Sequence, residues 1–226
     1  KVFVKSLPQN LDILYEDEHL LVINKKANLL TIATEKEKEE TAYAYLYDYV
    51  KAQKLENKIF IVHRLDKKAS GVLVFARSEE IKKKLQAQFE THDIDRVYIA
   101  IVEGRVKDES GTVQNYLAEN RVYKVYVTDD AKVGKWAITN YRVEKRTAGY
   151  TWLEVTMQTG RTHQIRVHLA GLGHPVIGDK EYGSKKNPLQ RLGLHASRLG
   201  FTHPATGEKM TFEVDAPPAF RKMFSR

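Results

Sequence analysis

The chain has 226 residues, of which 42% are hydrophobic and 29% are charged, as in an ordinary globular protein with one large core or two small ones. The absence of cysteine excludes disulfides, thiolate metal sites and a cysteine nucleophile and fits the reducing cytoplasm, and no apolar run reaches the ~20 residues of a membrane helix. The 37 Lys and Arg residues exceed the 29 Asp and Glu residues by 8, a surplus that suits a phosphate-rich partner.

The sequence pattern of the first part of the chain predicts paired strands and two capped helices. Apolar runs at residues 11–15 and 20–24 predict a strand pair around a charged turn, and residues 34–40 a solvated loop. Thr41 is a plausible N-cap for a helical pattern whose apolar residues, expected to pack in a core, are Tyr43, Leu46, Tyr47 and Val50. The alternation of tyrosines at positions 43, 45, 47 and 49 would also suit a strand. Ser78 is the predicted N-cap of a second helix.

A hairpin is predicted between these two helices. The runs at 59–62 and 72–75 read as buried strands, and the polar segment between them reads as a turn. Its bend is expected at Lys67, Lys68, Ser70 and Gly71, with Gly71 free to adopt a positive φ.

Strands dominate the second part of the chain. Residues 96–102 predict a strand in which Tyr98 faces away from its β-branched neighbours, and residues 111–158 predict several more. Thr162 is the predicted cap of a short helix that ends at Gly171 or Gly173, and two strands close the chain. Because strands outnumber helices without alternating with them, we expect an α+β fold with a mixed, mainly antiparallel sheet and flanking helices.

Common catalytic motifs are absent from the sequence. His163 and His168 are five residues apart, which does not align two metal ligands on a helix, and no acidic residue completes a metal-ligand spacing. The sequence contains neither a Walker-type phosphate loop, nor a Gly-rich dinucleotide fingerprint, nor a Gly-x-Ser-x-Gly elbow. We therefore expect no metal site.

With these motifs absent, Asp66 remains as the candidate catalytic residue. It lies in the turn of the predicted hairpin, close in sequence to His63 and Arg64, and folding can bring Arg166 near it. A carboxylate with one Arg partner is usually a structural salt bridge. The residues alone leave both interpretations open.

Three long motifs in order resemble those of one enzyme family. Residues 63–71, His-Arg-Leu-Asp-x-x-Ala-Ser-Gly, resemble the catalytic motif of the RluA-type pseudouridine synthases, usually written HRLDxxTSG. Residues 96–104 look like the second motif of that family, and residues 159–168, Thr-Gly-Arg-Thr-His-Gln-Ile-Arg-Val-His, are similar to the third. The resemblance extends from about Leu11 to about Pro217, and several independent motifs would have to coincide by chance to produce it.

This resemblance implies an activity and assigns roles to residues. The family isomerises uridine to pseudouridine in RNA, here expected to be ribosomal or transfer RNA, without a cofactor or metal. Asp66 would be the essential carboxylate, Tyr98 would stack on the target base, and Arg166 would pair with Asp66. The RNA-contacting residues implied are Arg64, which would fill the space left by the flipped uridine, His63, Arg161 and His163.

The sequence departs from the family pattern in two places. Ala69 replaces the usual Thr, which puts the rigidity of the catalytic turn in doubt more than its chemistry. Residues 24–28, Asn-Lys-Lys-Ala-Asn, replace Asn-Lys-Pro-x-Gly, and Asn28 can still adopt the left-handed conformation that Gly would supply. We expect one catalytic domain over residues 1–226, with no S4-like RNA-binding domain within this chain.

Two alternatives belong to other classes of function. An RNA-binding or ribosome-assembly factor on the same scaffold, with weak or no catalysis, is favoured by Ala69 and the altered turn, whereas the intact Asp66, Tyr98 and Arg166 argue against it. A glycosidase needs two cooperating carboxylates. The only loop acid in suitable company is Asp179, which more plausibly shapes its loop.

Overall fold

The computed structural model describes residues 7–225, and their contacts divide into two compact units. The first unit comprises the residues up to Asp95 together with Arg198–Val214, and the second comprises Arg96–Ser197 together with the segment from Asp215 onward. The sheets are antiparallel in every strand pair described below, so the predicted α+β class with a mainly antiparallel sheet is confirmed. No helix among the described residues is long and apolar enough to cross a membrane.

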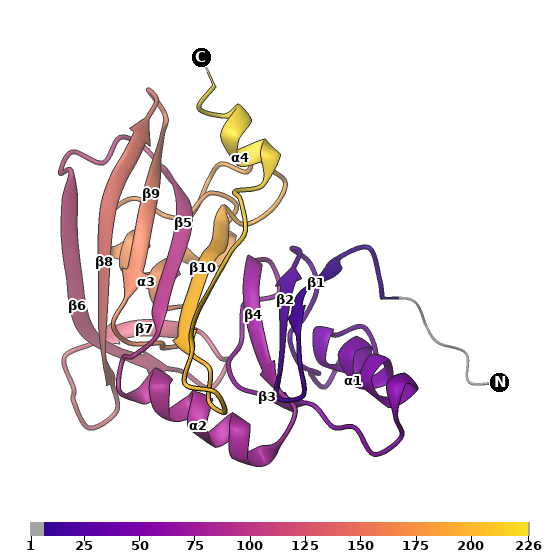
Figure 1. Cartoon of the computed structure of the whole chain (residues 1–226). Helices are drawn as coiled ribbons and strands as arrows, with labels where there is room; N and C mark the ends of the chain where they lie inside the picture. Colours follow the sequence, from indigo (N-terminus) through magenta and orange to yellow (C-terminus); the bar gives the residue numbers. More distant parts are fainter. Residues whose placement is uncertain (1–6, 226) are drawn as a thin grey trace. The chain divides into compact units, whose positions relative to one another are not determined.

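The first unit is built on an antiparallel sheet in which β2 lies between β1 and β4 (Figure 1). β3 pairs with the end of β4, and β11 pairs with the last residues of β10, a strand that starts in the second unit. The elements of this unit are β1 (Leu11–Glu16), β2 (Leu20–Lys25), α1 (Ala42–Gln53), β3 (Phe60–Ile61), β4 (Ser70–Ala76), α2 (Glu79–Glu90), β10 (Leu194–Thr202, from Arg198) and β11 (Lys209–Glu213).

The predicted elements of this unit are present with small shifts. The hydroxyl groups of Thr41 and Ser78 accept the backbone N–H groups of Ala44 and Ile81, as expected for N-caps. Apolar residues of β2, β4, α2 and β10 share one core. The expected packing of the α1 tyrosines in a core is wrong for Tyr47, which is 42% exposed, whereas Leu46 and Val50 are fully buried.

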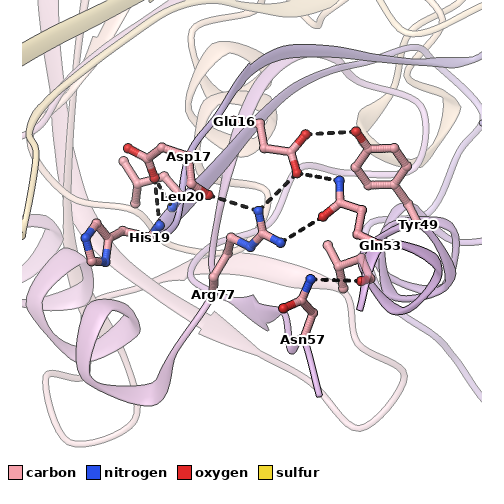
Figure 2. Close-up of polar contacts among 9 residues, drawn as sticks. Glu16, Asp17, His19, Leu20, Tyr49, Gln53, Asn57 and Arg77 are labelled. Atoms are coloured by element: carbon pink, nitrogen blue, oxygen red, sulfur yellow. Dashed lines mark hydrogen bonds and ion pairs between the residues drawn. The ribbon is translucent and has the colours of Figure 1, made fainter. Parts of the chain in front are cut away.

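Arg77 fixes the C-terminal end of β4 (Figure 2). Its guanidinium donates to Glu16 Oε1 at 3.0 Å, to the carbonyl oxygen of Asp17 at 2.9 Å and to Gln53 Oε1 at 2.9 Å. Glu16 in turn accepts the hydroxyl of Tyr49 at 2.8 Å. Because these contacts join β1, the β1–β2 turn and α1 to the end of β4, the strand that follows the Asp66 turn is held from its far end.

The second unit contains a five-stranded antiparallel sheet in the order β5-β9-β8-β6-β7. Its elements are β5 (Asp95–Glu103, from Arg96), β6 (Ser110–Glu119), β7 (Val125–Thr128), β8 (Lys135–Arg146), β9 (Tyr150–Met157), α3 (Gln164–Gly171), the 3₁₀ helix η1 (Lys180–Tyr182), the first half of β10 and α4 (Pro218–Lys222).

The two faces of this sheet are covered by different helices. Ile101 and Trp152 pack with Phe220 of α4 in one core cluster. On the opposite face, His168 and Gln164 of α3 bond to Thr139 of β8. Strand register places Tyr98 opposite Val155 and Val155 opposite Tyr141, two residues along β8 from Thr139. Tyr98 therefore lies on the α3 face, away from Ile99 and Ile101, as predicted.

Candidate active site

The predicted site residues fall into one group in each unit. The first unit holds His63, Arg64 and Asp66, and the second holds Tyr98, Arg161, His163 and Arg166. Each group is described below within its own unit.

Asp66 starts a tight turn between β3 and β4. It is half-buried, and its carbonyl oxygen accepts the N–H of Ala69 at 3.1 Å. Ser70 and Gly71 were expected in the bend but already belong to β4, since their backbone continues the ladder with β2. Gly71 has φ +120°, in the positive range that was predicted for it.

Lys25 holds this turn from inside the protein. Its side chain is fully buried at the end of β2, and Nζ donates to the carbonyl oxygens of Ala69 at 2.6 Å and Lys67 at 3.2 Å. Nζ also donates to Leu29 O at 2.8 Å and Lys26 O at 3.1 Å. A buried ammonium is stable only when hydrogen-bond acceptors replace water. These four carbonyl groups share its three protons and meet that requirement.

Two further residues fix the backbone beside Asp66. The Thr31 hydroxyl donates to the Leu65 carbonyl at 2.9 Å and accepts the Leu65 N–H at 3.2 Å. Asn28, with φ +69°, donates its N–H to the Lys67 carbonyl at 2.8 Å, so the left-handed conformation expected for Asn28 is confirmed. The hydroxyl missing at Ala69 is thus offset by contacts from Lys25, Thr31 and Asn28 around the turn.

The neighbours of Asp66 face different surroundings. Arg64 is exposed, as a residue that reaches into RNA must be. His63 is half-buried, its Nε2 accepts the Val74 N–H at 3.1 Å, and its ring lies 4.7 Å from that of Phe89. These contacts give His63 a role in joining the turn to β4 and α2, while its predicted contact with RNA stays a prediction.

The third motif is organised by a buried polar network under α3. Gln164 Oε1 accepts the Thr159 hydroxyl at 2.8 Å and the Arg161 N–H at 3.0 Å. The helix starts one residue later than predicted, because His163 is its N-cap in a left-handed conformation with φ +51° and Thr162 caps nothing. Gln164 therefore orders the entry to α3, the role that the sequence assigned to Thr162.

Arg166 is held by the segment around η1. It is 8% exposed, and its Nε and Nη2 donate to the two carboxylate oxygens of Asp179 at 2.7 and 2.8 Å. Nη2 also donates to Glu181 at 2.8 Å, and the guanidinium lies 4.9 Å from the ring centre of Tyr182. Asp179 thus does more than shape its loop, and the pairing of Arg166 with Asp66 stays a prediction.

Tyr182 also orients His163. Its hydroxyl oxygen accepts the Val125 N–H at 3.1 Å and shares a hydrogen bond of 2.8 Å with His163 Nδ1. Burial raises the pKa of Tyr182 to about 12, so the hydroxyl keeps its proton at neutral pH. Arg161, by contrast, is exposed and donates from Nε to the Trp136 carbonyl at 3.0 Å.

Arg96 lies against the third motif in a way that the sequence did not predict. A Cβ at Gly160 would come within 2.5 Å of Arg96 Nη1, so a larger residue at this position would force the guanidinium to shift. Burial lowers the pKa of Arg96, as expected for a cation that has lost water. The second and third motifs therefore meet where Arg96 passes Gly160, two residues from Tyr98.

We expect the buried imidazole of His168 to make the stability of the fold depend on pH. Thr139 Oγ1 accepts from Gln164 Nε2 and donates to His168 Nδ1, whereas His168 Nε2 donates to Asn115 Oδ1. The ring is 1% exposed, and burial lowers its pKa from 6.5 to about 4. As the pH falls below 6.5, His168 takes up a proton in the unfolded chain but not yet in the folded one. The stability present above pH 6.5 is therefore lost as the pH falls toward 4.

We expect this single group to cost about 2 kcal/mol of unfolding free energy between neutral pH and its folded pKa. Urea unfolding of the wild type and of His168→Asn across this range measures it, with His92→Asn on an exposed turn as the control. The wild type should lose more stability on acidification than His168→Asn, and equal losses would contradict the assignment.

Comparisons with known proteins agree with this arrangement of motifs. The model of the family described as RNA pseudouridylate synthase matches residues 19–171. The ribosomal large subunit pseudouridine synthase D of Zymomonas mobilis is 37% identical, over 95% of this chain and 72% of that protein. The tRNA pseudouridine synthase C of Vibrio parahaemolyticus is 32% identical, over 97% of this chain and 96% of that protein. The solved structure of human RNA pseudouridylate synthase domain containing 4 has a TM-score of 0.78 at 25% identity, over 97% of this chain and 93% of that chain.

Proposed function

Because the chain belongs to the RNA pseudouridylate synthase family, we propose that it isomerises specific uridines of ribosomal or transfer RNA, with Asp66 as the essential carboxylate. The relatives' names support both classes of RNA, since one acts on the ribosomal large subunit and another on tRNA. As an RNA pseudouridine synthase, the protein is an isomerase.

The reaction exchanges one bond of the ribose for another. Asp66 acts on the ribose of a flipped-out uridine, either by attacking C1′ or by promoting a glycal intermediate, and the bond from N1 to C1′ breaks. The uracil turns within the site and C5 bonds to C1′; on the first route this displaces the Asp66 carboxylate from C1′, and on the second C2′ regains the proton it lost. The hydrogen of C5 then leaves as a proton, and N1 takes up a proton. No oxidant, reductant or cofactor is needed to balance these steps.

The other site residues bind and orient the RNA. Tyr98 stacks on the target base, and Arg64 fills the space that the extruded uridine leaves in the RNA. Arg166 keeps Asp66 ionised and aimed, while His63, Arg161 and His163 contact the RNA around it. The basic surplus of the chain supports phosphate binding, and the lack of cysteine supports a cytoplasmic setting.

The observation that carries this proposal is the support of the Asp66 turn. A buried Lys25 and the Thr31 hydroxyl fix the backbone on both sides of a half-buried carboxylate. A salt bridge on a surface loop needs no such support, whereas a carboxylate that acts on one ribose carbon must be held in place.

Pseudouridine mapping on transcripts made in vitro, which start without the modification, tests this function. We expect the pure protein to form pseudouridine at one or a few positions of large-subunit ribosomal RNA or of a tRNA. The same result removes the alternative of an RNA-binding factor without catalysis. Absence of pseudouridine from both classes of RNA, with binding intact, would favour that alternative.

A further inference from the structure

Exposed apolar side chains are concentrated in one part of the second unit. Among residues 7–225, eleven large apolar side chains are exposed, and six of them lie between Val122 and Trp136. Val122 and Tyr123 are 77% and 76% exposed, at the tip of the hairpin between β6 and β7. A cluster of this kind marks an interaction surface more often than isolated apolar residues do.

Hydrogen bonds within the hairpin tip hold its backbone in one conformation. Asn120 Oδ1 accepts the N–H groups of Val122 and Lys124, and the Asn120 carbonyl accepts the N–H of Tyr123 at 3.0 Å. Tyr123 has φ +61°, a left-handed conformation that is unfavourable for a bulky residue. Since the ring is exposed, core packing does not explain why a tyrosine occupies this position, and such strain is often kept for function.

The charges around the tip fit RNA better than they fit a basic or a purely apolar partner. Residues 120–128 contain the cations Arg121 and Lys124 and no acidic residue. Both cations are exposed and flank Val122 and Tyr123. An aromatic ring between two cations can stack on an unpaired base while the cations contact the adjacent phosphates.

The tip also connects directly to the third motif. Val125, the first residue of β7, donates its N–H to the Tyr182 hydroxyl, which bonds to His163. Lys124 Nζ lies 5.9 Å from the centre of the Tyr182 ring. The hairpin tip is therefore continuous with the group of residues that we assign to RNA contact in this unit.

We propose that the β6–β7 hairpin tip is an RNA-binding element, in which Tyr123 stacks on an unpaired base of the substrate and Arg121 and Lys124 bind the flanking phosphates. This inference rests on the proposed function, because it takes RNA as the ligand. It adds a contact outside the three motifs, which strengthens RNA binding without taking part in bond chemistry.

Binding and kinetics of a Tyr123 series test the proposal. The probe is the in-vitro transcript on which the wild type forms pseudouridine, and activity of the wild type therefore establishes the proposed function separately. We expect Tyr123→Ala and Tyr123→Leu to raise Kd and KM about tenfold with kcat unchanged, and Tyr123→Trp to bind as well as the wild type. Stacking needs a flat ring, so leucine should fail although it is apolar.

Two variants separate binding from folding. Tyr123→Gly suits the positive φ, so it should be at least as stable as the wild type and still bind RNA about tenfold more weakly. Leu55→Ala removes a side chain that is 77% exposed in the first unit and should leave Kd unchanged. Unchanged RNA affinity in Tyr123→Ala would show that Tyr123 does not contact the RNA, and full RNA affinity in Tyr123→Leu would show that its contact is not stacking; either result would overturn the proposal.

Discussion

Asp66→Asn is expected to lower the rate of pseudouridine formation by at least ~1000-fold, the loss typical of removing a group that attacks or transfers a proton in the rate-limiting step. The amide has the size of the carboxylate but is a poor nucleophile and a poor base. The substitution should act locally, because the hydrogen bonds from the Lys25 and Thr31 side chains to backbone carbonyl groups of the turn remain available.

Single-turnover kinetics with excess enzyme give this rate directly, with pseudouridine counted by nucleoside chromatography. RNA affinity and the free energy of unfolding should stay near the wild-type values. Asp129→Asn, in the exposed loop between β7 and β8, makes the same change of charge and should keep full activity. An active Asp66→Asn variant would exclude Asp66 as the essential carboxylate.

Lys25→Met is expected to cost about 3–5 kcal/mol of unfolding free energy, because several buried carbonyl groups lose their donor and each costs about 1–3 kcal/mol when it is left unsatisfied. Methionine fills most of the space of lysine but donates no hydrogen bond. The carbonyl groups of Lys67 and Ala69 would then be buried without the Nζ donor. Since these groups form the Asp66 turn, activity should fall as well, even at temperatures where the variant is folded.

Urea unfolding and single-turnover rates on the same samples measure both effects. The adjacent lysine provides the matched control: Lys26 is exposed, and its ion pair with Asp12 at 3.6 Å has both side chains more than half exposed. Lys26→Met should therefore change stability by less than ~0.5 kcal/mol. Equal effects of the two substitutions would show that the buried contacts of Lys25 do not support the turn.

The elements that could be predicted are those whose signals are local. The strand pairs of the first unit, the caps Thr41 and Ser78, the positive φ of Gly71 and the face of β5 on which Tyr98 lies all follow from neighbouring residues. The cap of α3 could not be predicted in this way. Thr162 is the better cap by residue type, but Gln164 bonds to Thr159 and the backbone of Arg161 and thereby places His163 at the N-cap.

The supporting residues of the site depend on contacts that are distant in sequence. Lys25 reads as one more surface cation, and only folding brings it to carbonyl groups 42 and 44 positions away. Asp179, Glu181 and Tyr182 meet Arg166 across a loop, and Gly160 is explained only when Arg96 passes it. The motifs predict which residues perform chemistry, whereas the residues that support them are visible only in the three-dimensional structure.

Release of tritium from RNA labelled at C5 of uridine tests the central claim most directly, because the new bond from C5 to C1′ expels that hydrogen into water. We predict that the wild type releases one tritium for each pseudouridine formed, that no free uracil appears, and that Asp66→Asn releases none. Free uracil without tritium release would indicate a glycosidase, and no release from any ribosomal or transfer RNA transcript would contradict uridine isomerisation by this protein.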